Sequence, residues 1–219
     1  MDNLSTEDEQ LAALKKWWSD NGNSLLMGIG AALVIVFGWK AYQNNVIQEK
    51  TAASLQYQQL VTVATQNDFD SEDEAETVSY LAEQLKDEFE GTEYALYAAM
   101  FMAKDLVEDK NYEGAAEQLN WVLSKTEDVR LQHIVTARLA RILSAQEKHD
   151  DALALLKPSE EAFKASYLEI EGDIKKRQGD IPGAIEAYKN AFELIKEEPQ
   201  AQPLLAVKLS DLGIDPKTL

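Results

Sequence analysis

The chain of 219 residues contains no cysteine, which excludes disulfides, thiolate metal sites and lipid attachment through cysteine. Only two histidines occur, His133 and His149, and they lack the short spacing of helical metal ligands. We expect each on a helix surface or in a turn. The motifs G-x-S-x-G, G-x-x-x-x-G-K-[ST] and G-x-G-x-x-G are also missing. The sequence therefore predicts no enzyme, no cofactor and no metal.

Residues that break helices are absent from long stretches. No proline precedes Pro158, and no glycine occurs between Gly38 and Gly91. Such chain, rich in Ala, Leu, Gln, Glu and Lys, favours helix. No run alternates apolar and polar residues for long enough to form a strand. The predicted fold class is all-α.

Positive charge is scarce, with 21 Lys and Arg against 39 Asp and Glu, a formal net charge of −18. Residues 40–219 carry 34 acidic and 19 basic residues and suffice for one buried core. This charge argues against nucleic acid or an anionic lipid surface as a partner. The most acidic stretch, "NDFDSEDEAE" at 67–76, lacks the glycine and the spacing of an EF-hand. We interpret it as a solvated loop followed by a helix start.

One long stretch without charge stands near the N-terminus, the 19 residues from Asn21 to Trp39. As a helix it spans roughly 28 Å, close to the roughly 30 Å of a bilayer's hydrocarbon core. Trp17, Trp18 and Tyr42 flank it and suit the interface between water and lipid. The stretch predicts a transmembrane helix at 22–39, between a tail at 1–21 and a domain at 40–219.

Two alternatives to a retained anchor are a cleaved signal peptide and a buried helix of a soluble protein. Against the first, acidic residues outnumber two lysines ahead of the run, and no A-x-A-like site follows it. Against the second, the run has no polar face. Lys15 and Lys16 on one side balance Lys40 and Lys50 on the other, so the charges do not settle the orientation.

The segments on either side of the anchor also favour helix. Thr6 and Glu9 can form a capping box for a short amphipathic helix on the membrane surface, which we expect Asn21-Gly22 to end. The alternative is a frayed acidic tail. Beyond the anchor we expect helix toward Gln66, with four apolar residues facing later helices: Val46, Leu55, Leu60 and Val63.

Within the anchor, Gly28 and Ala32 share one face of the helix. Small residues at this spacing let another membrane helix approach closely, which predicts a packing face. The alternative is that glycine is common in membrane helices whatever their contacts.

The chain contains three similar segments: "AAMFMAKDLVEDKNYEGAAEQLNWVL" from Ala98, "TARLARILSAQEKHDDALALL" from Thr136 and "YLEIEGDIKKRQGDIPGAIEAYKNAF" from Tyr167. A small residue recurs in the first helix of each, and another follows 12 positions later, at offsets of 37 and 32 that bracket the roughly 34 of a tetratricopeptide repeat. These pairs are Ala103 with Ala115, Ala140 with Ala152, and Gly172 with Ala184. The sequence predicts a solenoid of helical hairpins.

The third segment departs from the pattern, because Glu171 and Lys175 stand where such repeats are usually apolar. We expect its first helix to rotate and bury Tyr167, Ile170 and Ile174 instead. A last helix from Pro203 to about Gly213 would then cover the open end of the solenoid.

Helical-hairpin solenoids usually bind peptides on the concave face, along the first helix of each unit. Within the repeat frame the lining candidates are Tyr97, Met100, Lys104, Ile134, Ala137, Arg141, Ser166, Glu169 and Asp173. They do not provide the Lys/Asn row of a clamp for acidic chaperone tails, and they suit an extended, partly apolar chain. The alternative for Tyr97 and Met100 is packing against a helix at 74–90.

The order of these features resembles a known family. A helix "LAALKKWWSDNG", an anchor ending "GWKAYQ", then "ASLQYQQLV", "ARLARILSAQEKHDDALALL" and "EGDIKKRQGDIPGAIEAY" are similar to the YfgM family of ancillary Sec translocon subunits. The resemblance runs over nearly the whole chain.

The resemblance implies a Gram-negative inner-membrane protein, with the N-terminus in the cytoplasm and the repeats in the periplasm. It also implies association with the SecYEG channel and the membrane-anchored periplasmic chaperone PpiD, and a role in passing emerging secreted polypeptides to folding factors. It carries over no catalytic residue. An alternative role is a membrane scaffold whose N-terminal tail holds a cytoplasmic response regulator.

Overall fold

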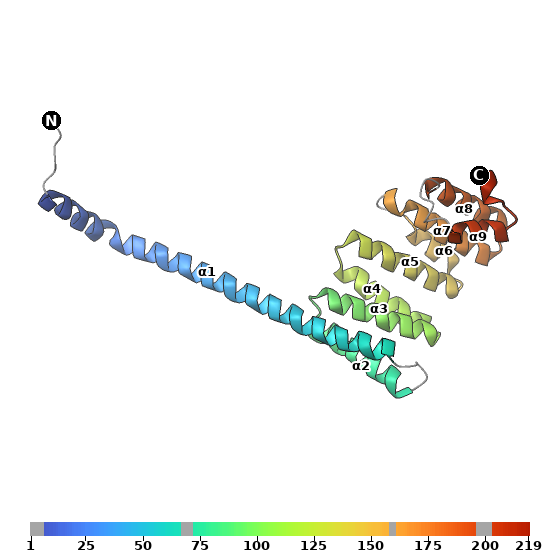
Figure 1. The fold of residues 1–219 in the computed structure, drawn as a ribbon, viewed down its shortest axis with the longest axis horizontal. Coiled ribbons are helices and arrows are strands. Elements are labelled where there is room, and N and C mark those ends of the chain that lie inside the picture. Colours follow the sequence, from blue (N-terminus) through green and yellow to red (C-terminus); the bar gives the residue numbers. More distant parts are fainter. Residues whose placement is uncertain (1–6, 67–71, 158–160, 196–202) are drawn as a thin grey trace. The chain divides into compact units, whose positions relative to one another are not determined.

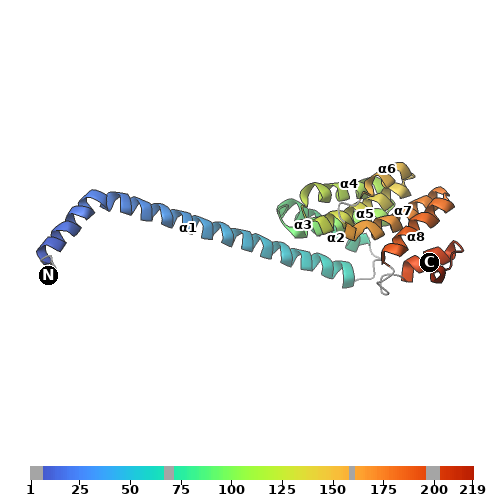
Figure 2. The ribbon, with the colours of Figure 1, turned by 90° about the horizontal axis from the view of Figure 1, so that it is seen from above.

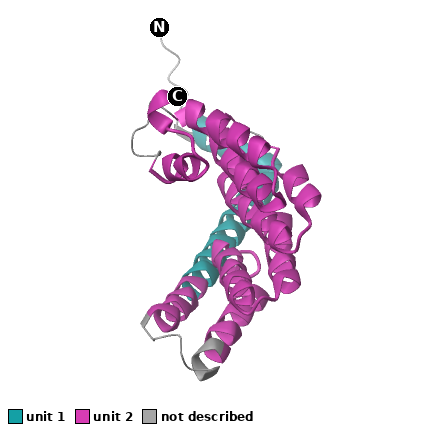
Figure 3. Cartoon of the chain, turned by 90° about the vertical axis from the view of Figure 1, so that its right-hand side faces the viewer, with its two compact units in different colours: residues 1–52 teal, residues 53–219 magenta. Residues whose placement is uncertain are grey.

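The computed structural model describes residues 7–66, 72–157, 161–195 and 203–219, and within them it is all-α, as predicted (Figure 1). The described elements are α1 (Glu7–Gln66), α2 (Glu72–Glu88), α3 (Glu93–Glu108), α4 (Tyr112–Lys125), α5 (Val129–Ala145), α6 (His149–Leu155), α7 (Lys164–Gln178), α8 (Ile181–Ile195), α9 (Pro203–Asp211) and two 3₁₀ turns, η1 (Glu161–Phe163) and η2 (Pro216–Thr218). Thr6 of the expected capping box lies outside the described residues. The chain divides into two compact units, residues 1–52 and 53–219 (Figure 3).

In the first unit, α1 continues through Asn21 and Gly22, so the expected helix end there is wrong. Asn21 donates its side-chain N–H to the carbonyl oxygen of Trp17 at 3.1 Å, and Gly22 lies against the ring of Trp18. Both residues are therefore accommodated inside a helix that bends in its N-terminal part without ending (Figure 2).

One helix in the described residues, between Glu9 and Thr65, is long and apolar enough to span a membrane. None of its apolar window is buried in the structure, which distinguishes it from the core helix of a soluble protein. A helix that is apolar all round and unburied is typical of a membrane span. Gly28 and Ala32 lie on this helix with open surroundings.

In the second unit, the end of α1 is the first wall of the repeat domain. Its inner face consists of residues four, three and four positions apart: Ala53, Tyr57, Leu60 and Ala64. Ala53, Tyr57 and Leu60 pack against residues of α2, such as Leu81 and Leu85, and of α3, such as Ala98. Leu55 was expected on this face but is 64% exposed, because a shift of two residues turns a helix by about 200°.

The hairpins α3–α4, α5–α6 and α7–α8 follow the three repeats. All six small residues of the repeat pattern are buried where paired helices touch: Ala103, Ala115, Ala140, Ala152, Gly172 and Ala184. After the first helix of each hairpin, one residue adopts a left-handed backbone conformation, namely Lys110, Glu147 and Gly179. These three turn residues repeat the offsets of 37 and 32, so the internal repeat is confirmed in the backbone as well as in the packing.

The first helix of the third hairpin is rotated as expected, so that the polar residues at usually apolar positions are not buried. Tyr167, Ile170 and Ile174 are buried, while Glu171 and Lys175 form an ion pair at 2.6 Å. Gly179 ends α7, and the carboxylate of Asp180 accepts the N–H of Gly183 at 3.0 Å in the first turn of α8. The last helix, α9, buries Leu205 and Leu209 against α8 and so covers the end of the array.

Candidate peptide-binding groove

The inner helices of the repeat domain line two adjoining hollows. The first, which we call the aromatic hollow, has a volume of about 250 Å³ and is lined by Tyr57, Tyr97, Met100, Phe101, Lys104 and Arg138. The second, the aliphatic hollow, has about 340 Å³ and includes Ala103, Val107, Leu119, Arg141 and Ile142. Met100, Lys104 and Arg138 line both. The two hollows therefore form one groove, built by α3, α4, α5 and the end of α1.

The aromatic hollow is organised around Tyr57 of α1. Its ring centroid lies 5.5 Å from that of Tyr94, 5.9 Å from that of Tyr97 and 6.3 Å from that of Phe101. Partial burial and the nearby Tyr97 raise the pKa of the Tyr57 phenol. The hydroxyl therefore stays protonated near neutral pH and remains a hydrogen-bond donor. Such tyrosine rings can contact both apolar and polar segments of a bound peptide.

The rim of the groove is basic. Lys104 pairs with Glu108 on its own helix at 2.7 Å. Arg138 and Arg141 are exposed on α5, and neither has a carboxylate oxygen within 4.0 Å among the described residues. Two guanidinium groups thus stand beside apolar surface with their hydrogen-bonding capacity directed to solvent.

A third hollow of about 340 Å³ continues from Arg141 to α7, α8 and α9. Here Lys208 of α9 places its ammonium 2.6 Å from Glu169 and 2.7 Å from Asp173. Tyr188 donates its hydroxyl to Asp173 at 2.8 Å. The acidic residues at this end of the groove are therefore already bound by the chain's own groups.

The structure brings Tyr97, Met100, Lys104 and Arg141 of the expected lining to the groove. Ile134 is 44% exposed one turn before Arg138 and lines neither hollow, and Ala137 is buried in the core. Glu169 and Asp173 face Lys208. Ser166 is half-buried on α7.

The alternative for Tyr97 and Met100 was packing against the 74–90 helix. Their described contacts are elsewhere: Tyr97 meets Tyr57 of α1, and Met100 packs on the core of α3, α4 and α5.

In the aromatic hollow, the sequence interpretation missed three residues, Tyr57, Phe101 and Arg138. Arg138 had a signal, since it lies four positions after Ile134 and three before Arg141 on the same face of α5. Tyr57 belongs to the segment after the anchor, and its neighbours come from α3, so no local pattern identifies it.

His133 differs from the expectation that it lies on a helix surface or in a turn. Its ring stacks on Phe163 at 4.2 Å and lies 4.5 Å from Tyr167, and its Nδ1 is buried without a described hydrogen-bond partner. Burial, and then the charge of Arg141, lower the pKa of this imidazole. The stacking partners follow about thirty residues later in the chain. His149 does lie at a turn, with Nδ1 3.1 Å from the hydroxyl of Ser144.

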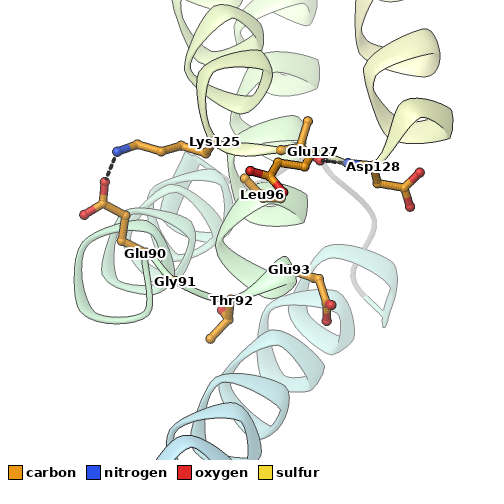
Figure 4. A pocket seen from close by; sticks show the side chains of 9 residues that line it. Glu90, Gly91, Thr92, Glu93, Leu96, Lys125, Glu127 and Asp128 are labelled. Carbon is orange, nitrogen blue, oxygen red and sulfur yellow. Dashed lines mark hydrogen bonds and ion pairs between the residues drawn. The ribbon is translucent and has the colours of Figure 1, made fainter.

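A larger hollow of about 570 Å³ lies between the α2–α3 and α4–α5 turns (Figure 4). Figure 4 shows Lys125 reaching across to Glu90, an ion pair of 2.6 Å that lowers the pKa of that carboxyl. Asp128 accepts the N–H of Arg130 at 2.8 Å as the N-cap of α5, which lowers its pKa too. Thr92 caps α3 in the same way. These groups hold helix ends, and the described residues contain no cluster of three or more metal-ligating side chains.

Comparison with known proteins supports the arrangement. The family described as tetratricopeptide repeat-like domain matches residues 15–214. A protein of Haemophilus influenzae is 28% identical over 94% of this chain and 97% of its own length. A protein of Escherichia coli is 27% identical over 98% of this chain and its whole length. One from Neisseria gonorrhoeae is 28% identical over 94% and 97%. Each of the three is named ancillary SecYEG translocon subunit, which confirms the resemblance seen in the sequence.

Proposed function

Because the chain belongs to the tetratricopeptide repeat-like domain family, we propose that it is a non-catalytic, membrane-anchored protein-interaction subunit working beside the SecYEG channel. The names of the full-length relatives support the place of action. The observation that carries the proposal is the groove, in which an aromatic hollow adjoins a rim that carries Arg138 and Arg141, an arrangement that suits the binding of an extended polypeptide. The apolar, unburied part of α1 supports anchoring.

In this proposal the anchor is retained in the bacterial inner membrane, with the N-terminus in the cytoplasm and the repeats in the periplasm. The groove binds secreted polypeptides as they leave the channel, and a PpiD-like membrane-anchored chaperone takes them over. Tethering near the channel raises the effective concentration of a weak site to about millimolar, so that individual contacts need not be strong. The alternative scaffold role depends on the tail at 1–21, of which residues 1–6 lie outside the described residues.

Photocrosslinking in native membranes tests the groove. A photoreactive residue in place of Tyr97 should crosslink to a secreted chain arrested in the channel. Tyr80 of α2, which is 59% exposed and lines neither groove hollow, supplies the matched control position. Crosslinks of equal yield from Tyr97 and Tyr80, or none from Tyr97, would contradict a binding role for the groove.

Topology needs a separate measurement. A reporter that is active only in the periplasm, fused after Leu219, should work, and the mature protein should keep its first 20 residues. Recovery of a species that is cut after the apolar run would refute the retained anchor.

A further inference from the structure

We propose that the groove selects extended polypeptide segments in which an aromatic or large aliphatic side chain lies directly next to carboxylates in the sequence. The proposal rests on the function proposed above and adds the chemical class of the ligand. Three observations support it: two arginines without a carboxylate partner among the described residues, the adjoining aromatic hollow, and the occupied acidic end of the groove in a chain of net negative charge.

The first observation is the pair Arg138 and Arg141. Their guanidinium groups are exposed on one face of α5, three positions apart, without a carboxylate partner among the described residues. Arginine binds carboxylates through two parallel hydrogen bonds, a geometry that lysine does not offer. Two such groups side by side fit a segment that carries two acidic residues.

The second observation is the position of the aromatic hollow. Arg138 and Lys104 line this hollow as well as the aliphatic one, so the basic rim directly borders the Tyr57 and Tyr97 rings. In an extended peptide, neighbouring residues are about 3.3 Å apart. A side chain seated among the rings thus brings the neighbouring residues to the arginines, which requires the charges to be adjacent to the apolar group.

The third observation concerns basic segments. Glu169 and Asp173, the carboxylates at the far end of the groove, are bound by Lys208, and Glu108 is bound by Lys104. A cationic peptide would have to displace these internal partners, whereas an anionic peptide meets free guanidinium groups. The chain as a whole has a net charge of −18, so this basic rim contrasts with the overall charge and favours anionic groups at the groove.

The test uses the full-length protein in lipid nanodiscs and three short, blocked, fluorescent peptides of equal length. Their central residues are Phe-Asp-Asp, Phe-Lys-Lys and Ser-Asp-Asp, and binding is followed by fluorescence anisotropy. We expect Phe-Asp-Asp to bind at least about tenfold more tightly than either of the others. Its affinity should fall as salt is raised.

Two sets of variants locate the site. Replacing both Arg138→Gln and Arg141→Gln should weaken Phe-Asp-Asp binding about tenfold. Arg130→Gln, which removes the same kind of charge from the exposed start of α5, is the matched control and should have little effect. Tyr97→Ala should weaken Phe-Asp-Asp and leave the weak binding of Ser-Asp-Asp unchanged. Circular dichroism of each variant checks that the helices remain.

Equal affinities for Phe-Asp-Asp and Phe-Lys-Lys would overturn the proposed selection for acidic segments. Equal losses of Phe-Asp-Asp affinity in the Arg138/Arg141 variant and in Arg130→Gln would overturn it as well. Those results leave the proposed function standing if crosslinking at Tyr97 succeeds. Failure of all three peptides to bind would also overturn this inference, and failed crosslinking at Tyr97 as well would reject the binding role of the groove.

Discussion

Gly172 sits at the closest approach of α7 and α8 and offers the sharpest test of the packing. A Cβ atom at this position would lie 2.3 Å from Cε1 and 2.4 Å from Cδ1 of Tyr188. Carbon atoms in contact are about 3.5 Å apart or more, so the ring would have to move by about 1 Å. Tyr188 is only 1% exposed and bonds to Asp173, so that movement disturbs a packed and hydrogen-bonded site.

The expected cost of Gly172→Ala combines two effects. Overpacking at such a site costs about 3 kcal/mol, the upper end of the usual range, while replacing glycine by alanine within a helix returns about 1 kcal/mol. The net loss in the free energy of unfolding is about 2 kcal/mol. For a chain of this size, that corresponds to a fall in the melting temperature of about 4–8 °C.

Thermal unfolding of the full chain in detergent, followed by circular dichroism, measures this change. A double-mutant cycle with Tyr188→Val identifies its cause, because the new methyl group has room once the ring is gone. In that background Gly172→Ala should be neutral or slightly stabilising. A melting temperature for Gly172→Ala at or above that of the wild type would refute this account, and so would an equal penalty in both backgrounds.

Three further predictions concern other sites. Ala152→Leu should lose about 1–3 kcal/mol of stability by overpacking a fully buried helix contact, whereas Ala154→Leu on the exposed face of α6 should melt near the wild-type temperature. Since the pKa of His133 is lowered on folding, the unfolded chain binds a proton at this residue more readily below about pH 6.5, and acid therefore destabilises the fold. The drop in melting temperature from about pH 7.5 to about pH 5 should be smaller in His133→Phe than in the wild type. An equal drop in both proteins would contradict this role of His133. Gly28→Leu with Ala32→Leu should reduce co-purification with the channel but leave membrane insertion intact, and undiminished co-purification would contradict a packing role for this face.

The sequence predicts the repeats well because their determinants are local. Small residues 12 positions apart and a glycine or polar residue at each turn specify hairpins without reference to distant parts of the chain. The continuation of α1 as far as Gln66 follows from the lack of helix-breaking residues after Gly38. Asn21-Gly22 shows where local rules fail: these residues favour a helix end in isolation, yet α1 continues through them, with the side chain of Asn21 bonded to the carbonyl of Trp17.

The groove was predictable only in part. Residues on the first helices of the hairpins follow from the repeat frame, so the sequence could predict Tyr97, Met100, Lys104 and Arg141 as groove residues. The contribution of Tyr57 and the capture of Glu169 and Asp173 by Lys208 join segments about 35 to 40 residues apart. Such long-range partners depend on how the helices stack, which the spacing of a single segment does not encode.

The order of the hydrophobic clusters along the chain bears on how the domain is made during synthesis. The first joins the end of α1 to α2 and α3, the next joins α3 to α5, another joins α5 to α7, and the last joins α8 to α9. Each cluster needs only chain that has already been made and its next neighbour, so contacts between distant segments are few. The repeat domain can therefore assemble hairpin by hairpin from its N-terminal side as the chain lengthens, without waiting for its last helix.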